Sequence, residues 1–73
     1  MERLRDIRED RDLKQSDIAK LLNVSQQTYS RYENDEISID KESLMKLALF
    51  YNTSVDYLLE LTDERKPYPR KKQ

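Results

Sequence analysis

Apolar residues along this chain recur every three or four positions, which is the spacing of one face of an α-helix. The clearest stripe is Leu44, Leu47, Ala48 and Tyr51, and shorter stripes precede and follow it. The breaks between stripes fall at polar positions that suit turns. The pattern predicts an all-α domain of five short helices, at residues 2–11, 15–22, 26–34, 41–51 and 55–59.

The third predicted helix has two chemically different faces. Placing residues about 100° apart around its axis puts Tyr29 and Tyr32 on one side, where they are suited to burial. The opposite side carries groups that form directed hydrogen bonds: Gln26, Gln27, Ser30, Arg31 and Asn34. We therefore expect the tyrosines to be buried and the amide and guanidinium groups to remain exposed.

Helix ends can be placed from residue type. The chain contains no Gly, so residues with left-handed backbone must be Asn or Asp, and we expect them at Asn23, Asn52 and either Asn34 or Asp35. The predicted N-caps are Ser25, Asp40 and Ser54. In the fifth helix we expect Val55, Leu58 and Leu59 to face inward.

Composition excludes several classes of protein. Seventy-three residues make one small domain, and the absence of Cys and His removes disulfides and the common zinc and nucleophile–base arrangements, so no metal or cofactor is predicted. No apolar run is long enough to span a membrane and the first residues do not resemble a signal peptide, which favours a cytoplasmic protein. Five short helices leave little room for a catalytic cleft, so we expect neither an enzyme nor a small-molecule substrate.

Charge is unevenly distributed along the chain. Residues 1–34 carry seven basic and seven acidic groups, residues 35–64 carry two and eight, and residues 65–73 carry five and none. The acidic excess therefore follows the amide-rich helix. Asp35 and Glu36 would repel phosphate if they faced it, so they point away or weaken binding.

Residues 2–61 contain a set of positions at which spacing and residue type agree together. Gln15 opens one short helix, the small Ala19 suits close helix crossing, and Asn23 occupies the turn that follows. Glu33-Asn34 gives the next helix the ending "E-N", and Ser54 to Leu59 gives a terminal helix. The apolar positions of this pattern are filled by Ile18, Leu22, Val24, Tyr29 and Tyr32. Together these positions resemble the Cro/repressor-type helix-turn-helix family, which includes lambdoid phage repressors. The resemblance implies a compact lambda-repressor-like fold and an ion pair between Arg8 and Glu33.

Double-stranded DNA is the partner that both the exposed helix face and the resemblance imply. Gln can bond adenine N6 and N7, and Arg can bond guanine O6 and N7. We expect base reading by Gln26, Gln27, Ser30 and Arg31, and phosphate contacts by Gln15, Ser25, Asn34 and Lys41. The expected function is that of a sequence-specific transcriptional regulator, and repression is expected over activation.

The C-terminal end suggests both a dimer and a tail. Members of the family commonly form dimers through this end on palindromic operators, so we expect a homodimer with Val55, Tyr57 and Leu61 at its interface. We place the domain boundary at residue 61 and expect residues 62–73, with two Pro and a basic cluster, to be a disordered tail, either solubilising or contacting DNA.

Other functions remain open at this point. Antitoxin or restriction-control regulators would use the same DNA surface. A protein-interaction module could keep the helical scaffold but bind another protein, which the acidic region 35–64 would suit.

Overall fold

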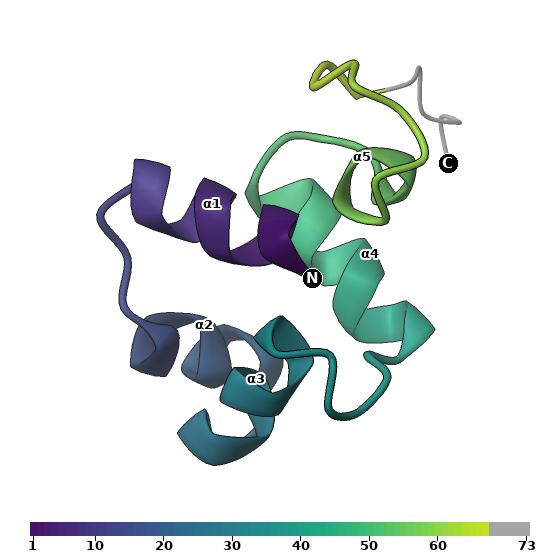
Figure 1. The fold of residues 1–73 in the computed structure, drawn as a ribbon. Helices are drawn as coiled ribbons and strands as arrows, with labels where there is room; N and C mark the ends of the chain where they lie inside the picture. The colour runs from purple at the N-terminus through teal and green to yellow at the C-terminus, as the bar shows by residue number, and fades with distance from the viewer. Residues whose placement is uncertain (68–73) are drawn as a thin grey trace.

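The computed structural model describes residues 1–67, and its regular structure there is entirely helical (Figure 1). The predicted all-α fold of five helices is confirmed, although the fifth is a single turn. The predicted disorder of the tail falls in part on residues 68–73, which lie outside the described residues. The helices are α1 (Glu2–Asp10), α2 (Gln15–Leu22), α3 (Gln26–Glu33), α4 (Lys41–Phe50) and α5 (Val55–Leu58).

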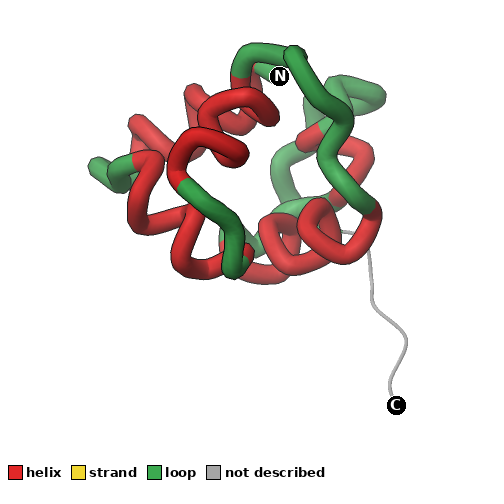
Figure 2. Tube along the Cα trace, turned by 90° about the horizontal axis from the view of Figure 1, so that it is seen from below, coloured by secondary structure: helices red, strands yellow, loops and turns green. Residues whose placement is uncertain are grey.

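Helix α1 contacts both of two helix pairs, α2 with α3 and α4 with α5. Figure 1 shows α2 and α3 together below α1, with α4 and α5 to its right, and Figure 2 shows the molecule from below. Helix α1 contacts both α3 and α5, so it joins the two pairs. The α2–α3 pair therefore packs against the rest of the domain on the side that faces α1, and its opposite side is accessible.

Side chains cap the N-termini of three helices at the positions that the sequence predicts. Ser25 accepts a hydrogen bond from the Thr28 amide at 3.1 Å. Asp40 and Ser54 bond the amides three residues later in the same way, and such caps satisfy amides that the helix itself leaves unpaired. All three predicted caps are confirmed.

Turns without Gly use Asn and Asp, as expected, and one other residue. Left-handed φ angles occur at Asn23, Asn52 and Asp35, which settles the choice between Asn34 and Asp35. Asp12 and Glu60 are also left-handed, and their sequence positions gave no sign of it. The expectation that every left-handed residue is Asn or Asp is wrong at Glu60. Glu60 follows the end of α5, where its own amide bonds the carbonyl of Tyr57 and the next amide bonds that of Asp56, although the conformation is unfavourable for Glu.

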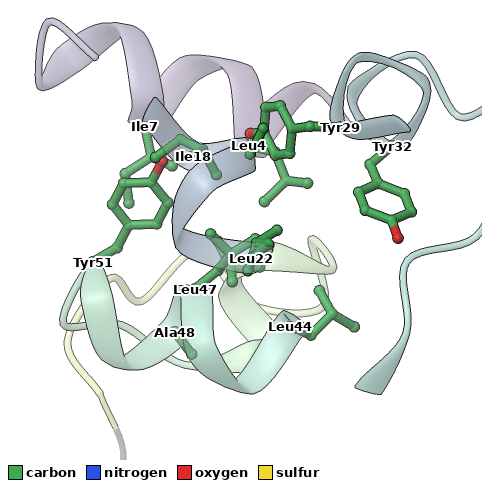
Figure 3. Packing of buried hydrophobic residues seen from close by; sticks show 12 residues of the cluster. Leu4, Ile7, Ile18, Leu22, Tyr29, Tyr32, Leu44, Leu47, Ala48 and Tyr51 are labelled. Carbon is green, nitrogen blue, oxygen red and sulfur yellow. The ribbon is translucent and has the colours of Figure 1, made fainter. Parts of the chain in front are cut away.

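The core lies where the five helices meet (Figure 3). Leu4 and Ile7 of α1 face it, as do the apolar stripe of α4 and Leu58 of α5. Leu59 does not, and the prediction that it faces inward is wrong, because its side chain is 40% exposed. Helix α5 ends at Leu58, so Leu59 follows the single helical turn and no longer keeps its inward register.

Candidate nucleic-acid interface

Helix α3 is fixed by its tyrosines. Tyr29 is fully buried and Tyr32 nearly so, and their rings meet edge to face with centroids 6.4 Å apart. Gln26, Gln27 and Arg31 are exposed on the opposite side. The predicted division of the helix into a buried aromatic face and an exposed polar face is confirmed. Because large buried rings anchor the helix, its polar side is presented rigidly.

A shallow depression of about 510 Å³ lies over the polar side of α3. Its walls come from α2, α3 and the loop after α3, and its lining residues are Gln15, Gln26, Gln27, Ser30, Arg31 and Glu36. All four side chains predicted to read bases therefore line one concave surface, with Ser30 half-buried. This surface, which we call the α3 groove, offers amide, hydroxyl, guanidinium and carboxylate groups at close range.

The acidic residues after α3 differ from each other. Asp35 forms an ion pair of 2.8 Å with the amino group of Met1. Glu36, in contrast, is exposed and lines the α3 groove. Asp35 has a left-handed backbone conformation, which turns the chain back toward α3. The amide of Glu36 then donates a hydrogen bond to the carbonyl of Arg31 at 3.0 Å.

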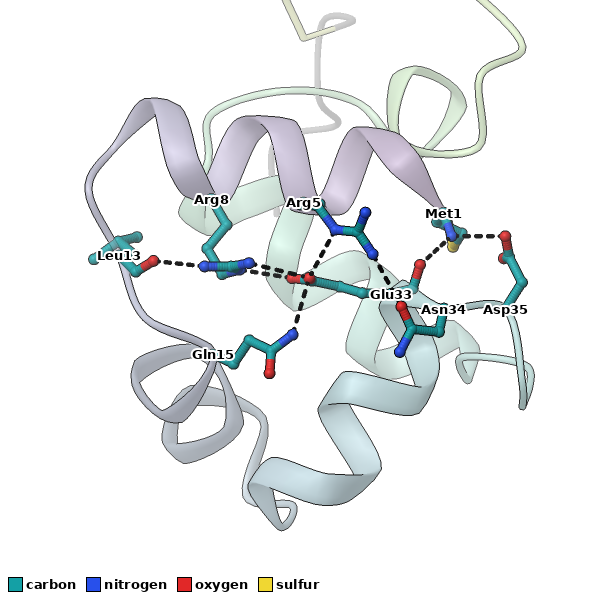
Figure 4. A network of polar contacts seen from close by, with 8 residues as sticks. All are labelled: Met1, Arg5, Arg8, Leu13, Gln15, Glu33, Asn34 and Asp35. Atoms are coloured by element: carbon teal, nitrogen blue, oxygen red, sulfur yellow. Dashed lines mark hydrogen bonds and ion pairs between the residues drawn. The ribbon is translucent and has the colours of Figure 1, made fainter.

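A buried ion pair joins α1 to the end of α3 (Figure 4). Arg8 Nε donates to Glu33 Oε2 at 2.7 Å and its Nη2 donates to Oε1 at 3.1 Å. The Glu33 side chain is fully buried, and Arg8 also donates to the carbonyl of Leu13. The pair implied by the family resemblance is therefore present, with the two-bond geometry that makes such pairs strong.

The Glu33 carboxylate stays charged although it is buried. Burial acts to raise its pKa, but the hydrogen bonds and charge of Arg8, with a smaller effect from Gln15, outweigh burial and hold the pKa below its usual value. Gln15 Nε2 donates to Oε1 at 3.2 Å. Gln15 thus both lines the α3 groove and contacts the ion pair, so the groove and the α1–α3 junction are joined.

Residues predicted to hold phosphates lie around this groove or beyond it. Ser25 is exposed and caps α3, so its hydroxyl and the helix start lie together. Asn34 is exposed at the end of α3, and its side-chain oxygen accepts a bond from Arg5 at 2.9 Å. Lys41 is exposed at the start of α4. The sequence gave no signal for Arg5, whose partner is 29 positions away.

The predicted dimer residues are exposed to different degrees. Leu61 is 72% exposed, whereas Val55 and Tyr57 are half-buried. The guanidinium of Arg3 lies 4.2 Å from the centre of the Tyr57 ring and also bonds the carbonyls of Tyr57 and Thr62. That of Arg65 lies 5.7 Å from the same ring. Residues just after α5 therefore fold back beside Tyr57.

Residues 1–67 contain neither a metal-binding cluster nor a membrane-spanning helix. No cluster of three or more Asp, Glu, His or Cys side chains there could hold a metal ion. No helix in this part of the chain is long and apolar enough to cross a lipid bilayer.

Helices α2 and α3 are short and joined by a tight turn, and the polar side chains of α3 are exposed. These are the features of a helix-turn-helix protein. Comparison with known families agrees: a helix-turn-helix family model matches residues 4–58. The chain belongs to this family, of the Cro/repressor type, and the lambda-repressor-like fold expected from the sequence is consistent with it.

Three curated relatives support the same assignment. The chain is 32% identical to the uncharacterized HTH-type transcriptional regulator YobD of Bacillus subtilis (strain 168), over 97% of this chain and 63% of that protein. It is 39% identical to the HTH-type transcriptional regulator ImmR of the same organism, over 78% and 45%. It is 37% identical to the cryptic phage CTXphi transcriptional repressor RstR of Vibrio cholerae, over 78% and 51%.

The chain spans about half to two thirds of the length of these relatives. No solved structure gives a significant match.

Proposed function

We propose that this chain is the DNA-binding domain of a sequence-specific transcriptional regulator, acting as a repressor. The observation that carries the proposal is the α3 groove, in which Gln26, Gln27 and Arg31 are exposed while Tyr29 and Tyr32 fix the helix from behind. Exposed donors and acceptors on a helix that is anchored from its other side match the pattern that base pairs display in the major groove. We expect the domain to act without catalysis or a cofactor.

Each polar group of the groove has a role in this proposal. Gln26 and Gln27 read adenine edges, Arg31 reads guanine, and Ser30 contacts a base at the margin. Contacts to phosphates fix the position of the helix without reading sequence. They are made by Gln15, Ser25, Asn34 and Lys41.

Repression follows from simple occupancy. A compact domain that covers a promoter blocks transcription without contacting any other protein. Of the relatives, RstR is named a transcriptional repressor, which supports this direction of regulation. Antitoxin and restriction-control regulators would bind DNA through the same groove. We place the protein in the cytoplasm.

Two copies on a palindromic operator are part of the proposal. A twofold arrangement would place two α3 helices in successive major grooves about 34 Å apart. We place the contact at the C-terminal end, through Val55, Tyr57 and Leu61, because Leu61 there is a large apolar side chain that is 72% exposed. Sedimentation of the protein with a selected operator measures the stoichiometry, and one copy per palindromic site argues against the dimer.

Selection of bound sequences from a random DNA pool tests the function directly. The parent protein is expected to enrich one motif with two symmetric halves. Gln27→Ala and Arg31→Ala each remove one reading contact, so each relaxes the preference at one position and weakens specific binding by about 1–3 kcal/mol. Lys46→Ala, an exposed residue of α4 outside the groove, is the control and should keep the parental motif.

A protein-interaction module is the second candidate. The acidic excess of residues 35–64 supports it, and so does the outer side of α4, where Met45, Leu49 and Phe50 are large exposed apolar residues. The two functions separate in one measurement. A parent protein that binds no DNA even at low salt rules out the DNA reader and supports the module.

A further inference from the structure

The exposed Arg5 of α1 contacts Asn34, the residue that directly follows α3 (Figure 4). Arg5 Nη2 donates to Asn34 Oδ1 at 2.9 Å, and the Arg5 side chain is 47% exposed. These residues are 29 positions apart, so the fold brings them together. Arg5 has no role in the function proposed above, yet it contacts one of the residues assigned to phosphate binding there.

The contact with Arg5 orients the amide of Asn34. A guanidinium group only donates hydrogen bonds, so the Asn34 atom beside it must be the oxygen. The amide nitrogen of Asn34 therefore points away from Arg5. Within residues 1–67 no hydrogen bond from that nitrogen is found, and the Asn34 side chain is exposed. It is a directed donor for an acceptor outside the domain.

Positive charge is in excess at this junction. The Glu33 carboxylate is matched by Arg8, which bonds both of its oxygens. Arg5 Nε lies at the longer distance of 3.8 Å from Glu33 Oε1. The neighbouring Asp35 carboxylate is paired with the Met1 amino group at 2.8 Å. Three cations and two carboxylates therefore leave a net charge of about +1, and the excess lies on Arg5 because Arg8 is the buried partner of Glu33.

This charge lies beside the α3 groove. Gln15, which lines the groove, donates to Glu33 Oε1 at 3.2 Å, and Arg5 approaches the same oxygen. Asn34 continues directly from the groove helix. A cation and an oriented amide donor at the edge of a base-reading surface suit an anion with several acceptor oxygens, which on DNA is a backbone phosphate.

We propose that Arg5 and Asn34 together bind one DNA phosphate, with Arg5 supplying the charge and also holding the Asn34 amide in position. The proposal rests on the DNA-binding function proposed above. It assigns Arg5 to affinity and not to sequence preference, because phosphate contacts are the same at every base pair.

The salt dependence of DNA binding tests this. Each neutralised phosphate contributes about 0.9 to the slope of log affinity against log salt concentration. Arg5→Gln removes the charge but keeps an amide donor near Asn34. We expect its slope to be shallower by about 0.9 on both a selected site and a random duplex, with an unchanged selected motif. Lys46→Gln on α4 removes the same charge elsewhere and should keep the parental slope.

The role of Arg5 in orienting Asn34 has its own measurement. Asn34→Ala should weaken binding to both duplexes, and it should weaken binding less when Arg5→Ala is already present, because the amide is then no longer held. Arg5→Lys keeps the charge and should keep the salt slope, which provides a second variant if Arg5→Gln folds poorly. Circular dichroism checks the fold of each variant.

The outcomes distinguish the two proposals. A parent protein that binds DNA with a clear motif, together with an Arg5→Gln variant of unchanged slope, overturns the phosphate site and leaves the DNA-binding function standing. Strictly additive effects of the Arg5→Ala and Asn34→Ala changes overturn the positioning role. A parent protein without any DNA binding overturns the function itself and the phosphate site with it.

Discussion

Replacing Glu33 with Gln is the sharpest test of what holds the α3 region against α1. The side chain is fully buried and receives three hydrogen bonds, two from Arg8 and one from Gln15. An amide of the same shape offers one acceptor oxygen instead of two, and it turns its NH2 group toward these donors. The Arg8 guanidinium would then be nearly buried without a counter-charge.

The expected cost is about 3 kcal/mol in the free energy of unfolding. Removing one partner of a buried ion pair costs about 3–5 kcal/mol, and the lower end applies because Arg8 keeps its bond to the Leu13 carbonyl and is 12% exposed. A domain of 73 residues has a total stability of about 4–11 kcal/mol. The substitution therefore removes a large part of it.

Urea unfolding followed by circular dichroism measures the effect, and two comparisons make it specific. Glu36→Gln is the matched control, since Glu36 is exposed and its change should stay within about 0.5 kcal/mol. The double variant Arg8→Met with Glu33→Leu should lose less stability than the two single changes added together, because no charge is then buried alone.

The pH dependence of the free energy of unfolding gives an independent check on the contribution of Glu33. Folding lowers the pKa of Glu33 from an ordinary value of 4.5, so its contribution is complete above about pH 4.5 and is lost as the pH falls through the folded-state pKa. The stability difference between parent and Glu33→Gln should accordingly shrink in acid. A difference below about 0.5 kcal/mol at pH 7, or one that grows in acid, would refute the reasoning.

Two further changes test the turn after α2 and the acidic wall of the groove. Asn23→Val should lower the free energy of unfolding by about 1–2 kcal/mol, because a β-branched residue is strained at φ 57°. Asn23→Gly should cost little, because Gly adopts this conformation freely. Equal urea midpoints for the two variants would contradict this. Glu36→Gln should tighten DNA binding by up to about fivefold at low salt by removing repulsion of phosphates, while Glu42→Gln on α4 should not; equal effects in a binding titration would exclude a local role for Glu36.

The features that the sequence predicted best are local. Ser25, Asp40 and Ser54 cap helices by bonding amides only three residues away, so residue type and position suffice. The two faces of α3 follow in the same way from the helical period, which separates Tyr29 from Arg31 on any regular helix. The lack of Gly directs four left-handed positions to Asn and Asp, and Glu60 is the exception among residues 1–67.

Contacts between distant segments were largely beyond sequence reasoning. Arg8 and Glu33 were paired only through the family resemblance, and nothing suggested that Arg5 would meet Asn34 or that Arg3 would lie over Tyr57. Such pairs depend on how helices cross, and every Arg on a charged helix is an equal candidate. The orientation of Glu36 was undecided for a related reason, because one left-handed residue before it sets where the loop turns.

The charge distribution supports the proposal that two copies bind one operator. Nonspecific affinity for DNA grows with the number of phosphates that cations neutralise. The chain has a net charge of −1, Arg8 is neutralised by Glu33, and Glu36 adds a negative charge to the groove itself. A single domain of this kind would hold random DNA weakly and depend on its base contacts. Because linking two such domains through a dimer makes the second binding step effectively intramolecular, the pair gains affinity for the operator without gaining charge. Weak attraction to random DNA then favours discrimination, since competing sites in a genome are far more numerous than operators.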